Sequence, residues 1–321
     1  MRYITSEQIE YLGINPSMCV EWVREAFLMK KECVLPPKIS IHPQGTDFIN
    51  TMPCLLPETY HRFGCKVVSR IKGSQPALKS DIMLIDSLTG DMIALLNADW
   101  ITAMRTGAVA ALAINTFRNS KANIYSFVGL GVIGHSTLDC FLATNSGKPI
   151  TIRLKRYKGH AEKTARRYSN YPNVKFEFAE TMEELVENAD VVVSCITDAD
   201  GLLVNDVSLF KPGVLVVPVH TRGFQNCDTV FDKVFADDEG HVKGFRYFNE
   251  FRKFGEIGDV LSGSIPGREN DSERILSYNI GLGLHDVLYA SKIIKMIDMQ
   301  TLTPPNKLIN YRIDSYVWFA A

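Results

Sequence analysis

The segment that most constrains the fold is a glycine-rich loop over residues 126–135, which reads SFVGLGVIGH. An apolar run leads into three glycines, Gly129, Gly131 and Gly134, at G-x-G-x-x-G spacing, and a helical pattern begins at Ile133. In a strand–loop–helix unit of this kind, the backbone N–H groups at the helix N-terminus face a pyrophosphate. Glycines also mark simple tight turns, but the strand before these three and the helix after them favour a dinucleotide-binding loop.

Each glycine of the loop has a separate expected task. Gly129 allows a tight turn, Gly131 lets a phosphate approach the backbone, and Gly134 lets the helix pack closely on the strand. We therefore predict that the loop binds a nicotinamide dinucleotide through its pyrophosphate.

The pattern after residue 123 predicts the fold class. Apolar strands alternate there with helices, which is typical of a parallel, doubly wound sheet. The expected strands are NIYSFVGL, PITIRLK, VKFEFA, DVVVSCI, GVLVVPV and KVFADD. Past Phe248 the pattern predicts helices over residues 251–263 and 279–297.

The first hundred residues have a different texture. Helical spacing of apolar residues over 6–31 predicts a leading helix, with Asn15 and Pro16 as a helix start. Short β-like runs follow, and an alanine-rich stretch over 98–117 predicts a helix that links this mostly β unit to the sheet.

Cofactor specificity is predicted from the end of the second strand. NAD-binding loops of this type are followed about 20 residues later by an Asp or Glu that binds the ribose 2′-OH. Residues 147–161 contain no acidic residue, and four basic residues, Arg153, Lys155, Arg156 and Lys158, lie around the end of the second strand. Because such cations neutralise a 2′-phosphate, NADP(H) is favoured over NAD(H). The other interpretation is that these charges form a solvated surface patch.

Composition argues against several other classes of protein. The chain has 321 residues, enough for two domains, and its 35 basic and 36 acidic residues form no basic block that would bind nucleic acid. We find no signal peptide and no apolar segment long enough to cross a membrane, so we expect a cytoplasmic protein. The seven cysteines are scattered and odd in number, which fits reduced thiols and argues against a metal site.

Six short stretches carry a family resemblance. They read MP at 52–53, GCKVVS at 64–69, DSLTG at 86–90, AMRTGAVAALA at 103–113, ADVVVS at 189–194 and GSIPGRE at 263–269. In this order they resemble the ornithine cyclodeaminase/μ-crystallin family. The resemblance implies a Rossmann domain, residues 118–288, inserted into a second α+β domain for substrate binding and dimerisation, residues 1–117 and 289–321. It also implies a homodimer, and the tail after Met299 is expected to be an extension or a swapped arm.

The resemblance assigns Lys66 and Arg105 to the reaction. Family members move a hydride between nicotinamide and the Cα of an amino acid or an imine. Lys66 would shuttle protons beside the substrate, and Arg105 would hold its carboxylate so that Cα faces the ring. Without the resemblance, Lys66 is an exposed strand lysine and Arg105 forms an ion pair on a linker helix.

Two positions depart from the family pattern. Lys38 stands where the family usually has a second carboxylate-binding arginine, and lysine lacks the bidentate fork. His220, in VHTRGF, stands at or near the acidic loop residue of the cyclodeaminases. Because the ordinary pKa of histidine is near neutrality, His220 is a candidate acid/base. Alternatively it is a packed polar residue, and Thr221 and Arg222 read the substrate.

The candidate site residues form three sets, and no metal ligand is expected. The catalytic residues are Lys66, Arg105 and His220. The substrate-binding residues are Lys38, Met52, Lys66 and Arg105. The cofactor-binding residues are Thr106, Gly129, Gly131, Val132, Ile133, Gly134, Lys155, Arg156, Thr197 and His220.

The expected activity is that of an NAD(P)-dependent amino-acid dehydrogenase or imine reductase. Its substrate would be an amino acid, a cyclic imine or an opine-like N-substituted amino acid. The GSIPGREND stretch also resembles the family branch that oxidises N-(2-amino-2-carboxyethyl)-glutamate. Two alternatives stay open: a cyclodeaminase that recycles its nicotinamide and releases ammonia, and a non-catalytic, NADPH-dependent binder of small ligands like μ-crystallin.

Overall fold

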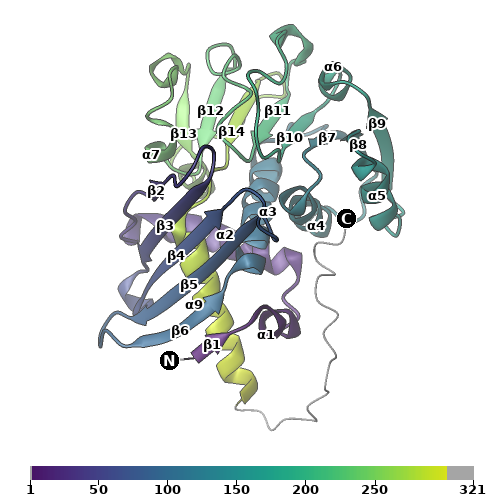
Figure 1. Ribbon diagram of the computed structural model, residues 1–321. Helices are drawn as coiled ribbons and strands as arrows, with labels where there is room; N and C mark the ends of the chain where they lie inside the picture. The colour runs from purple at the N-terminus through teal and green to yellow at the C-terminus, as the bar shows by residue number, and fades with distance from the viewer. Residues whose placement is uncertain (1, 302–321) are drawn as a thin grey trace. The chain divides into compact units, whose positions relative to one another are not determined.

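The computed structural model describes residues 2–301, which form two compact units (Figure 1). Residues 2–105 and 282–301 make the first unit, and residues 106–281 make the second. The sequence predicted boundaries after residue 117 and before residue 289. The chain instead changes unit inside α3 (Asp99–Phe117), and helical periodicity does not mark such a change. The predicted C-terminal arm lies outside the described residues.

The first unit contains a six-stranded sheet in the order β1-β6-β5-β4-β3-β2. Neighbouring strands from β2 to β6 are antiparallel, and β1 pairs with β6 in parallel. The bounds are β1 (Arg2–Ile4), β2 (Ile39–Ile41), β3 (Phe48–Leu55), β4 (Arg62–Arg70), β5 (Leu78–Asp86) and β6 (Met92–Asn97). The mostly β character of this unit is confirmed, whereas β1, only three residues long, was not predicted.

Helices pack on this sheet as two layers. Helix α9 packs against β3, β4 and β5, and α2 packs against α9. The predicted helix over 6–31 is divided, because Gly13 takes a left-handed conformation (φ +64°) and Asn15 Oδ1 accepts the Met18 N–H at 2.9 Å to begin α2. The helical elements are α1 (Ser6–Tyr11), α2 (Pro16–Met29), η1 (Lys30–Glu32), η2 (Glu58–Tyr60) and α9 (Gly283–Thr301).

The second unit contains an eight-stranded sheet in which all neighbours are parallel. The order is β13-β12-β14-β11-β10-β7-β8-β9, so its last five strands have the arrangement of a doubly wound dinucleotide-binding half. The predicted fold class is confirmed. The bounds are β7 (Ile124–Val128), β8 (Ile150–Lys155), β9 (Val174–Ala179), β10 (Val191–Ser194), β11 (Leu215–Pro218), β12 (Lys233–Ala236), β13 (Phe254–Glu256) and β14 (Ile275–Tyr278).

Helices connect these strands, as expected for parallel neighbours. They are α4 (Val132–Ala143), α5 (His160–Arg167), α6 (Met182–Val186), η3 (Val207–Leu209), α7 (Glu239–Val242), η4 (Phe248–Glu250) and α8 (Ile257–Leu261). The four residues of β10, β11, β12 and β14 are buried throughout, so the sheet is covered on both faces.

Three sequence predictions near the end of the second unit were wrong. The helix expected over 251–263 is a strand, β13, followed by the short α8. Strand β14 was missed, because a four-residue run buried on both faces shows no alternation. Helix α9 begins at Gly283 and not at 279, since Gly281 is left-handed (φ +96°) and the Ile280 N–H is held by Asp237 Oδ2.

Candidate active site

Lys66 lies in the interior of the first unit. Strand alternation turns Gly64, Lys66 and Val68 of β4 toward the buried face. A Cβ on Gly64 would lie 2.8 Å from the Val287 side chain, so glycine lets α9 approach this strand. The Lys66 side chain is fully buried, and its Nζ lies 2.9 Å from Asp286 Oδ1 and 2.8 Å from Asp286 Oδ2 on α9. Lys66 is therefore a buried ion-pair partner and not an exposed strand lysine.

Arg105 reaches the same carboxylate from α3. Its Nε donates to Asp286 Oδ1 at 3.0 Å, and the side chain is 6% exposed. Its Nη1 is buried and has no hydrogen-bond partner among the described residues. A buried guanidinium nitrogen without an acceptor costs free energy unless a ligand supplies one. We call Lys66, Arg105 and Asp286 the Lys66 cluster.

The Lys66 cluster has an excess of positive charge, and this affects the lysine. Burial lowers the pKa of the Lys66 amine to about 7, the Arg105 and Lys38 cations add to the decrease, and Asp286 opposes it. A group with a pKa close to the ambient pH can both donate and accept a proton.

Asp286 was not predicted from the sequence. It lies in the apolar stretch NIGLGLHDVLYA, where His285 and Asp286 are the two ionisable residues before Tyr289, and both are buried. A carboxylate inside an apolar helical segment is rarely buried without a partner, and this anomaly was the available signal.

The other predicted substrate residues surround Lys66. Met52 is its cross-strand partner in the β3–β4 ladder and is buried. Lys38 lies half-buried before β2, near enough for its charge to lower the pKa of Lys66. Lys38, Met52, Lys66 and Arg105 therefore come together in one unit, as the sequence predicted.

The glycine loop of the second unit has the geometry expected of each glycine. Gly129 is left-handed (φ +85°), and a Cβ there would lie 2.4 Å from Cys195 C, so the loop after β7 touches the loop after β10. A Cβ on Gly134 would lie 2.3 Å from Gly129 O, whereas one on Gly131 would enter open space. Packing therefore requires glycine at 129 and 134, and space is left beside Gly131.

The first turn of α4 follows this open space. Gly131 is its N-cap and provides no side-chain hydrogen bond, so the N–H groups of Val132 and Ile133 are among the orphan donors of the helix N-terminus. Strands β7 and β10 lie at the point where the strand order reverses, which is where doubly wound sheets bind ligands. Thr197 is exposed in the loop after β10. Thr106 lies on α3 next to Gly107, where a Cβ would lie 2.3 Å from the Ser136 backbone of α4, so α3 and α4 pack closely at this point.

His220 does not have the near-neutral pKa that we expected from the sequence. It follows β11, and burial lowers the pKa of its imidazole to about 4. The Arg222 N–H donates to Nδ1 at 3.4 Å, so Nε2 carries the hydrogen and donates to Ser194 Oγ at 2.7 Å. The imidazole is therefore neutral at pH 7, and its hydrogen bonds join the loop after β11 to the end of β10.

The four basic residues around the end of β8 already have partners. Arg156 Nε donates to Glu162 at 2.7 Å, its Nη1 pairs with Glu180, and its guanidinium lies 4.9 Å from the Phe178 ring centroid. The Lys155 amine donates to the Glu180 carbonyl at 2.7 Å. Arg153 donates to carbonyls of α6 and its C-cap, and Lys158 lies over the ring of Tyr157. Arg156 remains 44% exposed in its side chain.

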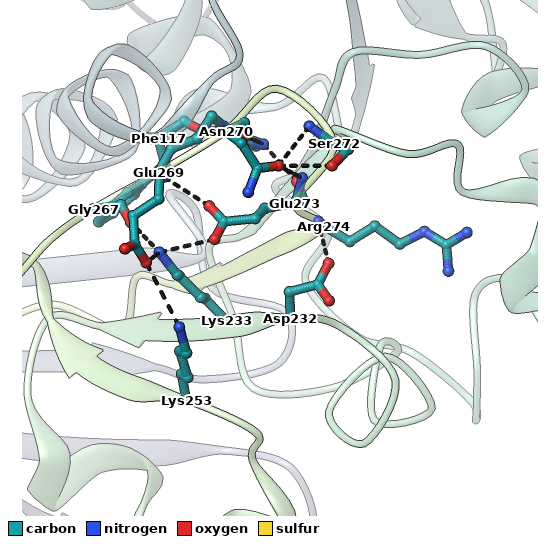
Figure 2. A network of polar contacts seen from close by, with 11 residues as sticks. Phe117, Asp232, Lys233, Lys253, Gly267, Glu269, Asn270, Ser272, Glu273 and Arg274 are labelled. Atoms are coloured by element: carbon teal, nitrogen blue, oxygen red, sulfur yellow. Dashed lines mark hydrogen bonds and ion pairs between the residues drawn. The ribbon is translucent and has the colours of Figure 1, made fainter.

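The GSIPGRE stretch lies at the opposite edge of the sheet, before β14. Lys233, at the start of β12, is 3% exposed and donates to the Gly267 carbonyl at 2.6 Å and to Glu269 at 2.5 Å (Figure 2). Glu273 lies 3.0 Å from the same amine. We call Lys233, Gly267, Glu269 and Glu273 the Lys233 network. It fixes the loop before β14 to the sheet.

No group of three or more His, Cys, Asp or Glu residues that could hold a metal occurs within residues 2–301. In the same part of the chain, no helix is long and apolar enough to cross a membrane. All seven cysteines lie in this range, and none forms a disulfide.

The fold and these side chains define an α/β protein with a glycine loop of dinucleotide-binding type in one unit and a buried cluster of a lysine, an arginine and an aspartate in the other. The chain belongs to the ornithine cyclodeaminase/mu-crystallin family, whose model matches residues 5–299. Its relatives are named reductases and dehydrogenases, which support an NAD(P)-dependent oxidoreductase of amino acids or imines.

Three relatives illustrate the range of names. The nodulation efficiency protein NfeD of Rhizobium meliloti is 28% identical, over 82% of this chain and 84% of its own length. A Delta(1)-pyrroline-2-carboxylate reductase of Bacillus thuringiensis is 26% identical, over 73% of this chain and 77% of its own length. The N-((2S)-2-amino-2-carboxyethyl)-L-glutamate dehydrogenase of Staphylococcus aureus is 26% identical, over 69% of each chain.

A solved structure supports the fold. The Thermococcus litoralis Delta(1)-pyrroline-2-carboxylate reductase, in complex with NADH and L-proline, superposes with a TM-score of 0.83 at 22% identity, covering 94% of this chain and 98% of the other.

Proposed function

We propose that this protein reduces the C=N bond of a carboxylate-bearing imine, or oxidises the corresponding amine, with a nicotinamide cofactor. The observation that carries the proposal is the buried Arg105 Nη1 without an acceptor, beside a lysine with a pKa of about 7. A carboxylate substrate would supply the acceptor, and the lysine would supply or remove the proton. Relatives named for pyrroline carboxylate and for a glutamate conjugate both act on compounds of this class.

Arg105 is the proposed carboxylate anchor. Its Nε is held by Asp286, so the guanidinium has a fixed orientation and Nη1 remains for the substrate. A fixed guanidinium binds a carboxylate through charge-assisted hydrogen bonds and limits the orientation of Cα. Lys38 adds a second positive charge near the site.

Lys66 is the proposed proton donor and acceptor. In the direction of reduction, its ammonium form donates a proton to the substrate nitrogen, which becomes an amine. In the direction of oxidation, its neutral amine takes this proton back. We assign no proton transfer to His220, because an imidazole with a pKa of about 4 is a weak base and lacks the acidic imidazolium proton near pH 7.

The glycine loop fits a dinucleotide. Space lies beside Gly131, and the orphan N–H groups of the first turn of α4 can donate hydrogen bonds to a pyrophosphate, with Thr197 in the neighbouring loop. The bound cofactor supplies or accepts the hydride at Cα. We further propose a preference for NADP(H), because Arg156 occupies the position of the ribose-binding carboxylate and is exposed and stacked on Phe178.

Arg156→Gln tests this preference. We expect Arg156 to leave Glu162 and Glu180 and to bind the 2′-phosphate of NADPH. In Arg156→Gln, the ratio of kcat/KM for NADPH to kcat/KM for NADH should then fall about 10- to 100-fold, because a hydrogen bond to a charged group contributes roughly 1.5–3 kcal/mol. Lys175→Gln, on the neighbouring strand, is a matched surface control. An unchanged ratio would mean that Arg156 only pairs with the two glutamates.

A homodimer and a cytoplasmic location complete the proposal. The dimer is implied by the family resemblance, and the location is supported by the scattered cysteines. Light scattering of the purified protein should give twice the mass of one chain.

The decisive experiment follows the absorbance of the reduced nicotinamide. Purified protein is mixed with NADPH or NADH and Δ1-pyrroline-2-carboxylate, and in the reverse direction with the oxidised cofactor and L-proline, N-(2-amino-2-carboxyethyl)-glutamate or L-ornithine. We expect a net absorbance change with at least one pair, and none with Lys66→Met. Ammonia release from ornithine without net absorbance change would instead indicate a cyclodeaminase, and cofactor binding without any turnover would indicate a ligand-binding protein.

A further inference from the structure

The three charged side chains of the Lys66 cluster come from three different elements of the first unit. Lys66 lies on β4, Arg105 on α3 and Asp286 on α9, and each is at most 5% exposed. Asp286 Oδ1 is shared, since it accepts from Lys66 Nζ at 2.9 Å and from Arg105 Nε at 3.0 Å. One carboxylate thus holds the proposed proton donor and the proposed substrate anchor at fixed positions.

The charge of the cluster is not balanced. With Lys66 protonated it holds two positive charges and one negative charge, and burial makes the excess costly. The other titratable groups around it do not supply a second anion. They are Lys38 before β2, which adds positive charge, the Cys54 thiol on β3, whose pKa is raised, and the buried His285 next to Asp286. A second anion in this place would balance the charge.

We propose that Asp286 is a positioning residue that couples the binding of a substrate carboxylate at Arg105 to the retention of a proton on Lys66. This inference deepens the proposed function and rests on it. The carboxylate that reaches Arg105 Nη1 brings the missing negative charge, so the cluster becomes neutral with Lys66 as an ammonium. Binding of a carboxylate-bearing substrate therefore keeps on Lys66 the proton that reduction of the C=N bond consumes. Binding of an uncharged analogue does not stabilise the ammonium form of Lys66 in this way.

Asp286 has a specific part in this coupling. Asp286 Oδ1 accepts from Arg105 Nε, which leaves Nη1 for the substrate, and both oxygens of the Asp286 carboxylate lie within 2.9 Å of the Lys66 amine. Removing its charge should make the ammonium less favourable, and removing the charge of Arg105 should do the opposite.

The test measures the protonation of Lys66 directly and needs no turnover. The protein is labelled with [ε-13C]lysine, the Lys66 signal is assigned by its loss in Lys66→Met, and its titration midpoint is followed by NMR. We expect a midpoint near 7 in the unaltered protein. It should fall by about 1–3 pH units in Asp286→Asn, rise by a similar amount in Arg105→Gln, and return toward 7 in Asp286→Glu.

Asp298→Asn is the matched control. Asp298 lies on the same helix in an exposed ion pair with Arg2, so its removal should leave the Lys66 midpoint unchanged. If Asp286→Asn does not fold, Arg105→Gln and Asp286→Glu still carry the test. A midpoint near 10 in the unaltered protein, or variants that do not shift it in opposite directions, would overturn the inference.

The failure of the inference can be separated from failure of the proposed function. Midpoints that shift as expected in a protein that never changes nicotinamide absorbance would retain the coupling and reject the oxidoreductase. Turnover that persists with an unshifted midpoint in Asp286→Asn would retain the oxidoreductase and reject the coupling.

Discussion

Two buried lysines, one in each unit, differ in how well the protein compensates their charge. Lys66 is fully buried and lies beside a single carboxylate, which it shares with Arg105. Lys233 is 3% exposed and lies beside two carboxylates and one carbonyl. Burial is nearly equal, but two cations share one carboxylate around Lys66, whereas around Lys233 two carboxylates balance Lys233 and Lys253.

The difference separates a reactive group from a structural one. The Lys233 amine has two carboxylates and one carbonyl as partners, and its network fixes the loop before β14. Lys66 has a pKa lowered to about 7 by burial and by neighbouring cations, and next to it an arginine nitrogen lacks an acceptor. A buried charge that its neighbours do not fully neutralise is typical of a functional site. A buried ion pair with only a structural role can be replaced by apolar residues without loss of stability.

Replacing Lys66 should have the largest effect on activity. Lys66→Met should lower kcat by about 10²- to 10⁴-fold, the usual contribution of a positioned acid/base. The free energy of unfolding should stay within about 1 kcal/mol or rise, because Asp286 keeps Arg105 as a partner and a costly buried amine is removed. Steady-state kinetics and urea unfolding measure the two quantities. A stability loss with unchanged kcat would make Lys66 structural.

Replacing Lys233 should give the reverse pattern. Lys233→Met leaves the largely buried Glu273 without its cation, whereas the half-exposed Glu269 keeps Lys253, so the free energy of unfolding should fall by about 1–3 kcal/mol. At a temperature where the variant is folded, kcat should remain close to that of the unaltered protein. Urea unfolding and activity assays of the same samples measure the two quantities. A free energy of unfolding equal to that of the unaltered protein would show that Lys233 is not needed for stability.

Arg105→Lys should have the next largest effect. Lysine keeps the charge but cannot hold Asp286 and a carboxylate at the same time, so kcat/KM for a carboxylate substrate should fall about 10- to 100-fold. An uncharged analogue of the same substrate is the control and should lose much less. Equal losses for both compounds would argue that Arg105 does not bind the carboxylate.

The pH dependence of the unaltered protein sharpens the comparison further. Because the ammonium form of Lys66 is needed for reduction, kcat/KM should fall about tenfold per pH unit above about 7. Oxidation needs the neutral amine, so its kcat/KM should instead rise with pH up to about 7 and then level off. Profiles of both directions in one buffer series provide the check, and profiles with the same slope in both directions would contradict the assignment.

The smallest effect is expected at His220, a half-buried base whose pKa burial lowers to about 4. Its two ring nitrogens are already used by Arg222 and Ser194, so it resembles Lys233 more than Lys66. His220→Gln, which retains hydrogen bonding, should leave the pH–rate profile between pH 6 and 9 unchanged and alter kcat by less than about threefold. A displaced profile would return His220 to the acid/base role.

The sequence predicted the parallel sheet and the glycine loop through local patterns, namely strand–helix alternation and the G-x-G-x-x-G spacing. Lys66 and Arg105 were singled out by the family resemblance, since without it the sequence favoured an exposed lysine and an ion-paired arginine. Strand β14 and the start of α9 were missed, because they depend on long-range pairing and on the Asp237 bonds to residues 280 and 281. The role of Asp286 was missed for the same reason, since its partners are 181 and 220 residues away in the chain.

The sequence also did not predict which groups surround each charged residue. The spacing of residues 153–158 indicated basic character but not that Glu162 and Glu180 already pair with Arg156. The ordinary pKa of histidine led to an acid/base role for His220, whereas burial lowers that pKa to about 4. Charge state depends on three-dimensional surroundings, which a sequence pattern does not contain.

Transfer of deuterium from C4-deuterated reduced nicotinamide to a carboxylate-bearing imine tests the central claim most directly. Mass spectrometry of the amine formed from Δ1-pyrroline-2-carboxylate should show one deuterium at Cα with the unaltered protein and with Lys233→Met. The same experiment with Lys66→Met should give almost no labelled product in equal time. Equal labelling by Lys66→Met, or consumption of the cofactor without deuterium at Cα, would contradict the account.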